Sequence, residues 1–217
     1  MQKASNPIHT SHVLAGDCDK LQSHYEAWAS CYNADVKREA YSGPSVIANL
    51  SALITESYLN VPLSKTHILD SGCGTGLVGV ELKKLGFQHI DGNDLSPNML
   101  EVAEKTDAYK KLEAGVDLNC DSPITAASHY DVVVSCGVLT LGHVQPEALK
   151  QLANPLKQNG YLIVSTRNSY LNDSNFKKIS LRLEQEGYVR LIMCLPNARY
   201  IAEEDAHYWV YQKGPSL

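Results

Sequence analysis

Residues 68–77 read ILDSGCGTGL, a short apolar run that leads directly into three glycines at alternate positions. The apolar run is typical of a buried strand, and residues 77–85 beyond it have the apolar spacing of a helix. Glycine tolerates positive φ and lets a ligand lie against bare backbone. Gly72, Gly74 and Gly76 therefore predict a ligand-binding turn between a strand and a helix.

The spacing of these glycines argues against two common nucleotide loops. A dinucleotide loop of the G-x-G-x-x-G type would place its last glycine at position 77, where this chain has Leu77. The G-K-S/T end of a P-loop is absent. Asp70, just before the loop, would repel a pyrophosphate but attract an ammonium or sulfonium group. S-adenosylmethionine carries both groups and no phosphate, so we expect it as the cofactor.

Two further acids stand at the ends of the next two predicted strands. Asp94 is placed to accept hydrogen bonds from both ribose hydroxyls, and Asp117 from the adenine amino group. The apolar neighbours Leu95 and Leu118 would sandwich the adenine ring. Taken alone, Asp94 could instead cap the helix that follows it. The order of the three acids on successive strands favours a cofactor site.

Strands and helices alternate along the chain. Helices are predicted at residues 17–41, which carry an aromatic stripe, and at 45–58, 77–85, 146–156 and 175–185, with another that opens at Ser96-Pro97. Strands are predicted at residues 66–70, 89–94, 112–118, 130–136, 161–166, 188–195 and 206–212. This alternation predicts an α/β fold with a doubly wound sheet.

Composition narrows the function classes. The 217 residues are 44% hydrophobic and 20% charged, as expected of one soluble globular domain. Twenty-four acids against 19 bases give a formal charge of −5, which argues against nucleic acid as a partner. No apolar run is long enough to span a bilayer, and no signal peptide is visible. The six cysteines include no C-x-x-C pair, which predicts reduced thiols in a cytoplasmic protein and no metal site.

Three motifs resemble those of the class I S-adenosylmethionine-dependent methyltransferases. They are ILDSGCGTGLV at residues 68–78, GNDLSPNML at 92–100 and YDVVVS at 130–135. The resemblance spans about residues 66–213 and is specific for the cofactor, not for the methyl acceptor. More narrowly, YEAWASCYNADV at residues 25–36 is similar to a group of methyltransferase-like proteins typified by the one encoded in the Williams–Beuren deletion region.

The resemblance implies a Rossmann-like sheet of seven strands, mostly parallel, with an antiparallel last strand. It implies one methyltransferase domain over residues 1–217, with an N-terminal helical segment or lid at 1–60 and the catalytic core at 61–217. The cofactor would be S-adenosylmethionine, and its product after methyl transfer would be S-adenosylhomocysteine. The predicted cofactor-binding residues are Asp70, Gly72, Cys73, Gly74, Gly76, Asp94, Leu95, Asp117, Leu118 and Ser135.

Residues for the acceptor are expected at the ends of the fourth and fifth strands and on the N-terminal helix. His143 is the candidate general base, unless it only caps the helix after it. Arg167 could clamp a substrate carboxylate or form a structural ion pair. Tyr25, Trp28 and Tyr32 could wall an apolar or cationic acceptor pocket, or belong to the core.

The fourth strand also lacks the N/D/S-P-P-Y/F tetrad with which many enzymes of this kind grip a base or a glutamine amide. We therefore expect a methyltransferase that acts on a small molecule by in-line transfer, as a monomer or homodimer, with neither nucleic acid nor membrane as partner. Two alternatives remain open at this point. One is methylation of a protein lysine or N-terminal amine, and the other is a non-catalytic S-adenosylmethionine-binding subunit of a partner.

Overall fold

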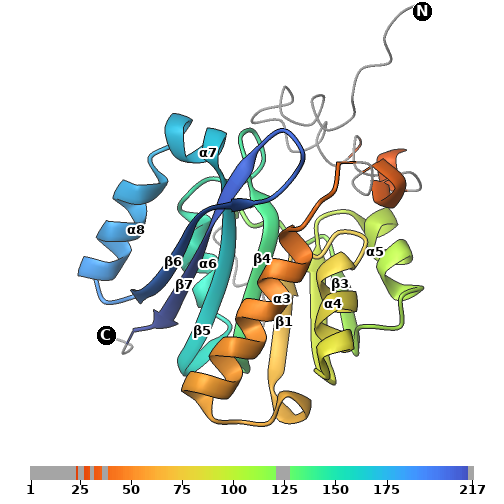
Figure 1. Cartoon of the computed structure of the whole chain (residues 1–217), viewed down its shortest axis with the longest axis horizontal. Coiled ribbons are helices and arrows are strands. Elements are labelled where there is room, and N and C mark those ends of the chain that lie inside the picture. The colour runs from red at the N-terminus through yellow and green to blue at the C-terminus, as the bar shows by residue number, and fades with distance from the viewer. Residues whose placement is uncertain (1–22, 24–26, 30–31, 36–38, 121–127, 215–217) are drawn as a thin grey trace, which may run out of the picture.

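A seven-stranded sheet with helices on both faces forms the centre of the molecule (Figure 1). The computed structural model describes residues 23, 27–29, 32–35, 39–120 and 128–214. The strands are β1 (His67–Ser71), β2 (His89–Asp94), β3 (Lys111–Ala114), β4 (Tyr130–Leu139), β5 (Leu156–Arg167), β6 (Val189–Arg199) and β7 (Asp205–Lys213).

The strand order confirms the predicted doubly wound fold. It runs β3-β2-β1-β4-β5-β7-β6 across the sheet. The first five strands in this order pair in parallel, whereas β7 is antiparallel to both β5 and β6. The order reverses between β1 and β4. In sheets of this type, ligands bind at that switch point, beyond the carboxyl ends of the strands.

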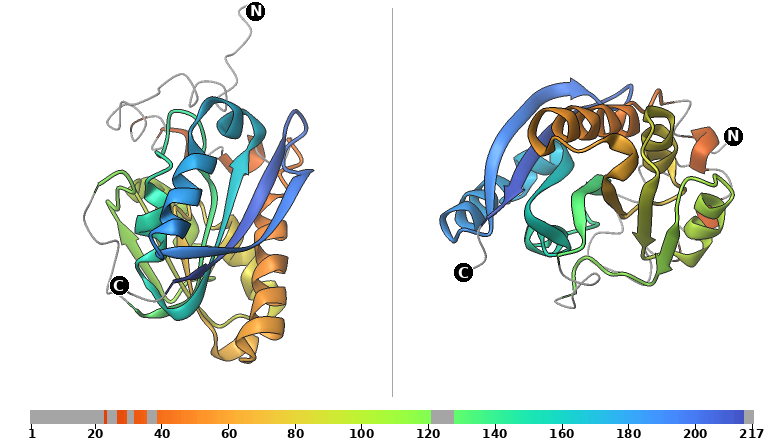
Figure 2. Two further views of the ribbon diagram at one scale, coloured as in Figure 1. Left: turned by 90° about the vertical axis from the view of Figure 1, so that its left-hand side faces the viewer. Right: turned by 90° about the horizontal axis from the view of Figure 1, so that it is seen from below.

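The helices form a layer on each face of the sheet (Figure 2). They are α3 (Gly43–Ile54), α4 (Leu77–Leu85), α5 (Pro97–Glu104), α6 (Ala148–Ala153), α7 (Asn168–Asp173) and α8 (Phe176–Gln185). A π-helical turn, η1 (Thr55–Leu59), and a 3-10 turn, η2 (Leu63–Lys65), follow α3. The α3 and α4 helices pack together on one face, and α6 and α8 cover the other.

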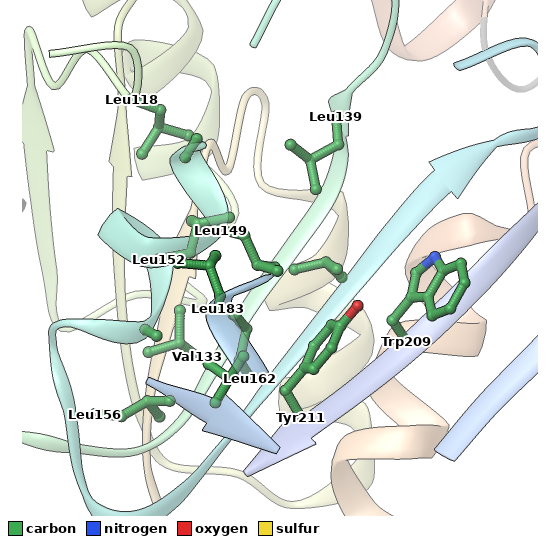
Figure 3. Packing of buried hydrophobic residues seen from close by; sticks show 14 of the residues in the cluster. Leu118, Val133, Leu139, Leu149, Leu152, Leu156, Leu162, Leu183, Trp209 and Tyr211 are labelled. Carbon is green, nitrogen blue, oxygen red and sulfur yellow. The ribbon is translucent and has the colours of Figure 1, made fainter. Parts of the chain in front are cut away.

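The apolar strand residues alternate between the two layers. Ile68 is fully buried in the cluster under α3 and α4, while its neighbour Leu69 belongs to the cluster under α6 and α8. In the second cluster, Leu149 of α6 and Leu183 of α8 lie over Val133 of β4 (Figure 3). This burial on both faces explains the continuous apolar runs of the central strands.

Several boundaries differ from the predicted ones. The third strand ends at Ala114 instead of residue 118, because Gly115 turns the chain with φ +76°. Asp117 and Leu118 therefore lie in a loop. The β5 strand begins at Leu156, which was predicted to be helical, and α7 was not predicted at all. Of the helix predicted at 17–41, the described residues 23, 27–29 and 32–35 are helical, and much of the remainder lies outside the described residues.

Two observations bear on the expected environment of the chain. Cys73, Cys136 and Cys194 are free thiols in the described part of the chain. Within the part of the chain that the structure describes, no helix has both the length and the apolar character needed to cross a bilayer.

Three histidines gather at the amino ends of the parallel strands, opposite the switch point. His67 stacks on His89 with 4.7 Å between ring centroids, and His129 meets His67 edge-on at 5.7 Å. Burial lowers the pKa of His67 below its usual value, and the fields of His89 and Lys157 lower it further, against the opposing field of Asp131. The folded protein therefore disfavours the charged form of His67.

We predict that this cluster destabilises the protein in mild acid. The unfolded chain takes up the His67 proton near its ordinary pKa of 6.5, whereas the folded chain resists it. The free energy of unfolding should therefore fall as the pH drops below about 6.5. Urea unfolding between about pH 8 and pH 5 should show a smaller fall for His67→Asn than for the wild type. Equal pH dependence of the two proteins would contradict this prediction.

Candidate functional site

A pocket opens at the carboxyl ends of β1, β2 and β4, at the switch point of the sheet. It holds about 810 Å³ of empty space, part of it open to solvent. The pocket is lined by Tyr32, Gly72, Gly74, Asp94, Leu95, Ser96, Met99, Val116, Asp117, Leu118, Asn119, Cys136, Gly137, Val138, His143 and Val144.

The glycine loop forms the inner edge of this pocket. The backbone N–H groups of Gly72 and Cys73 both donate to the carbonyl of Asn93, each at 2.9 Å. Gly72 has φ +72°, and a Cβ at this position would collide with Val138 of β4. Gly74 has φ +52°, and the space beside it is open among the described residues. The loop thus presents bare backbone to the pocket.

Asp94 ties the loop to the end of β2. Its Oδ2 accepts a hydrogen bond from Gly74 N at 2.8 Å, and its Oδ1 accepts one from Ser96 N at 2.9 Å. Each carboxylate oxygen keeps lone-pair capacity for a second donor. Burial raises the pKa of Asp94, and the two backbone hydrogen bonds oppose the rise. The cap of α5 is Ser96, whose hydroxyl accepts from Met99 N at 3.3 Å, so Asp94 is not the helix cap.

The loop after β3 forms the opposite wall. Asp117 and Leu118 both line the pocket there, and Leu95 faces it from the end of β2. Asp117 Oδ1 accepts from Asn119 N at 2.8 Å, and Asn119 Nδ2 donates to the carbonyl of His143 at 3.0 Å. These bonds fasten the loop to the turn after β4.

The residues present fit S-adenosylmethionine. A carboxylate with spare lone pairs suits a ribose diol, and the side chains of Leu95 and Leu118 suit an adenine ring. The open space beside Gly74 leaves room for a chain of atoms along the loop.

Asp70 lies behind the loop and not in the pocket wall. It is fully buried, its Oδ2 accepts from the Tyr109 hydroxyl at 2.7 Å, and its Oδ1 has no hydrogen-bond partner among the described residues. The Tyr109 oxygen in turn accepts from Gly79 N at 3.1 Å. Burial raises the pKa of Asp70 to about 7, and the field of Asp94 adds to it. Any attraction of Asp70 for a cationic ligand would act across the loop.

Three more of the predicted cofactor residues lie outside the pocket wall. Cys73 is buried against Leu100 of α5, and Gly76 begins α4 with φ +87°. The Ser135 hydroxyl donates to the carbonyl of Ser71 at 2.8 Å and so joins β4 to β1. In this structure the three residues support the loop from behind.

His143 lines the pocket from the turn after β4. Its Nδ1 lies 2.8 Å from the Thr140 hydroxyl, and its backbone N–H donates to the Thr140 carbonyl at 3.1 Å. The α6 helix has Glu147 at its N-cap and no side-chain cap bond, so His143 does not cap that helix. The contact with Thr140 holds the ring at the pocket wall.

Tyr32 is the described residue of the N-terminal helix that lines the pocket. Burial raises its pKa, so the phenol stays protonated. Trp28 stands behind Tyr32 with 4.7 Å between ring centroids and donates to Asp35 Oδ2 at 2.7 Å. Tyr25 lies outside the described residues. Of the predicted aromatic wall, the structure thus brings Tyr32 into the pocket and leaves Trp28 outside its lining.

Arg167 forms the structural ion pair that was one of its two alternatives. Its Nε donates to Glu204 Oε2 at 2.7 Å, and Glu204 Oε1 accepts from Ser169 N at 2.6 Å. Arg167 does not line the pocket, although its guanidinium lies 5.8 Å from the ring centroid of Tyr200.

Half of the pocket wall consists of residues that the sequence did not predict as functional. The lining residues it did not assign are Ser96, Met99, Val116, Asn119, Cys136, Gly137, Val138 and Val144. Most of them are apolar residues next to predicted strands or helices, where they have the pattern of ordinary core positions. Gly137, with φ +77°, carried the clearest signal, because a glycine in a β-branched strand marks a close approach.

Comparison with known proteins agrees with this geometry. A family model described as "Methyltransferase domain" matches residues 45–214. Methyltransferase-like protein 27 of Homo sapiens is 32% identical over 186 residues, which cover 83% of this chain and 72% of that protein.

Two solved structures share the fold at low sequence identity. A TehB-like SAM-dependent methyltransferase from Corynebacterium glutamicum is 21% identical, with a TM-score of 0.64 over 88% of this chain and 98% of that one. Magnesium protoporphyrin IX methyltransferase from Synechocystis PCC 6803, solved with bound SAM, is 15% identical, with a TM-score of 0.61 over 99% of this chain and 100% of that one.

The raised pKa of Asp70 gives a testable prediction about how the stability of the protein depends on pH. Because the folded-state pKa of this acid is raised, its contribution to stability is present at low pH and is lost as the pH rises toward 7. Asp70→Asn keeps an acceptor for Tyr109 and removes the charge. We predict a larger free energy of unfolding for this variant at about pH 8, with a gain that shrinks toward about pH 5. A variant less stable than wild type at the higher pH would contradict this account of Asp70.

Proposed function

The chain belongs to the class I methyltransferases that depend on S-adenosylmethionine, and we propose that it methylates a small molecule. One observation supports the proposal of a small-molecule acceptor. The pocket is partly covered by the chain's own N-terminal helix, since Tyr32 lines it and the Thr75 hydroxyl donates to Asn33 Oδ1 at 2.6 Å. A pocket covered in this way suits an acceptor that enters whole better than a segment of a polymer.

Bound S-adenosylmethionine supplies an electrophilic methyl group on its sulfonium sulfur. In our proposal Asp94 holds the ribose hydroxyls, Asp117 accepts from the adenine amino group, and Leu95 and Leu118 pack on the ring. The remaining tasks of the protein are to align the acceptor with the methyl group and to exclude water. His143 is the proposed base for an acceptor that arrives protonated.

We propose that the N-terminal segment acts as a lid. The Asn33–Thr75 hydrogen bond joins it directly to the glycine loop, and the Trp28–Asp35 bond stabilises the helix that carries Tyr32. The likeness of this segment to the methyltransferase-like proteins supports a narrower kinship, as does the identity with Methyltransferase-like protein 27. Neither names an acceptor.

The first experiment is calorimetric titration of the full chain with S-adenosylmethionine and S-adenosylhomocysteine, followed by a screen for transfer of labelled methyl to small molecules. Binding and transfer together would support the proposal. Binding with transfer only to lysine or to N-terminal amines of proteins would favour protein methylation. Binding without any transfer would favour the non-catalytic subunit.

We predict that Asp94→Asn lowers the affinity for S-adenosylhomocysteine by about 100-fold, because both ribose hydroxyls lose a charged acceptor. Asp91→Asn is the matched control, since Asp91 lies on the same strand and accepts from the Tyr130 hydroxyl, outside the pocket lining. Calorimetry compares the two variants, and circular dichroism checks the fold. Equal affinities for the two would remove Asp94 from the ribose role.

We also predict that Asn33→Ala speeds dissociation of S-adenosylhomocysteine by roughly 3- to 10-fold. This is the effect expected when the lid loses its hydrogen bond to Thr75. Asn33 is exposed, so its loss should leave the core intact. Asn49→Ala, which removes another exposed asparagine bonded only within α3, is the control. Stopped-flow release of the ligand measures the rates, and an unchanged rate in Asn33→Ala would argue against a lid.

A further inference from the structure

Four polar side chains meet behind the pocket wall at the end of β4. The Tyr41 hydroxyl lies 3.2 Å from Cys136 Sγ and 3.2 Å from the Tyr200 hydroxyl. The Ser165 hydroxyl donates to Cys136 Sγ at 3.8 Å. We call Tyr41, Cys136, Ser165 and Tyr200 the hydroxyl–thiol cluster.

The cluster reaches the pocket through Cys136 and Gly137, which both line it. A Cβ on Gly137 would lie 2.8 Å from the Tyr200 oxygen and 2.9 Å from the Tyr41 oxygen. The two phenols therefore stand at the place where any other residue would put a side chain. Gly137 N donates to the Ser165 hydroxyl at 3.0 Å and fixes this arrangement.

Among the residues that the structure describes, the proton count of the cluster leaves one donor over. Two phenols, a thiol and a hydroxyl carry four protons, and the three contacts among them use three. The spare proton lies on Tyr41, Tyr200 or Cys136, according to the direction of the bonds. A ligand with a hydrogen-bond acceptor would satisfy it.

The charge state of the cluster makes it a donor and not a base. Burial raises the pKa of both tyrosines and raises that of Cys136 to about 12, so the three groups stay protonated at neutral pH. The cluster itself contains no carboxylate or imidazole that could accept a proton. Beyond Tyr200 lies the guanidinium of Arg167, whose charge is balanced by Glu204.

We propose that the hydroxyl–thiol cluster binds the methyl acceptor and that the acceptor is a carboxylate. This inference rests on the proposed function. An ammonium group would bring donors to a site that already offers donors. An alcohol would have to give its proton to His143 on another part of the wall, because no member of the cluster can take it. A carboxylate brings acceptor oxygens and is already the nucleophile.

The transfer then balances without a proton. One carboxylate oxygen forms the new O–CH₃ bond while the S–CH₃ bond of the sulfonium breaks and its electron pair stays on sulfur. The products are a methyl ester and a neutral thioether. The cluster holds the second carboxylate oxygen and so orients the first one.

The test uses the full chain with methyl-labelled S-adenosylmethionine and paired probes that differ in charge, namely benzoate against benzylamine and hexanoate against hexylamine. Calorimetry with S-adenosylhomocysteine is run first on every variant. Methyl esters are recognised because alkali releases their label as methanol. Tyr41→Phe and Tyr200→Phe each remove one cluster hydroxyl. Tyr161→Phe is the control, because it removes a phenol of the same core cluster whose oxygen contacts Gln212.

We expect label to enter at least one carboxylate and neither amine. We expect kcat/KM for that carboxylate to fall about 10-fold or more in Tyr41→Phe and Tyr200→Phe, as for loss of a hydrogen bond to a charged group, with unchanged S-adenosylhomocysteine affinity. Tyr161→Phe should match the wild type.

Normal S-adenosylhomocysteine binding with no ester from either carboxylate, or with label in the amines, would overturn the carboxylate assignment and leave the methyltransferase standing. Wild-type kcat/KM in both phenylalanine variants would overturn the role of the cluster. Failure to bind S-adenosylhomocysteine would instead refute the cofactor site, and this inference with it.

Discussion

The hydrogen bond between the Asp94 carboxylate and Gly74 N, at 2.8 Å, holds the candidate site together. It is made possible by the parallel register of β1 and β2, in which Ser71 pairs with Asn93, so that the next residue of each strand reaches the same edge of the sheet. The second oxygen of Asp94 holds the backbone of Ser96 and thereby the start of α5. One side chain thus sets the distance between the glycine loop, the end of β2 and a helix. A carboxylate already fixed in this way needs little reorganisation when a ligand arrives.

Sequence reasoning was most successful where the information is local. The glycine loop, the acid that ends β2 and the Ser96-Pro97 start of α5 each lie within a few residues of a strand or helix boundary, and all were predicted. Asp70 lies behind the loop because strand alternation puts it on the face of Ile68, toward α4, and its role toward the cofactor stays a prediction. The partner of Arg167 was beyond prediction, because Glu204 is 37 residues away and meets it only when β7 has joined the sheet. The hydroxyl–thiol cluster likewise gathers residues up to 159 positions apart.

The buried pair of Asp70 and Tyr109 shows how closely the loop is supported from below. The Tyr109 ring fits only because two positions around it are glycines: a Cβ on Gly79 or on Gly92 would come within 2.9 Å of ring atoms. The pair joins β1 to the first turn of α4 directly under the loop. Burying an acid in this way costs stability, and such costs are characteristic of functional sites.

The place of β7 in the sheet has a consequence for how the chain is made. This strand is the last of the seven in sequence, yet it lies inside the sheet, and among the described strands β6 pairs with β7 alone. When β6 has been synthesised, its native neighbour β7 has not, so β6 cannot yet take its native place in the sheet. The edge of β5 that pairs with β7 likewise stays unpaired until β7 has been synthesised. Completion of the sheet therefore depends on β7, and a chain that stops before residue 205 would lose two strands and not one.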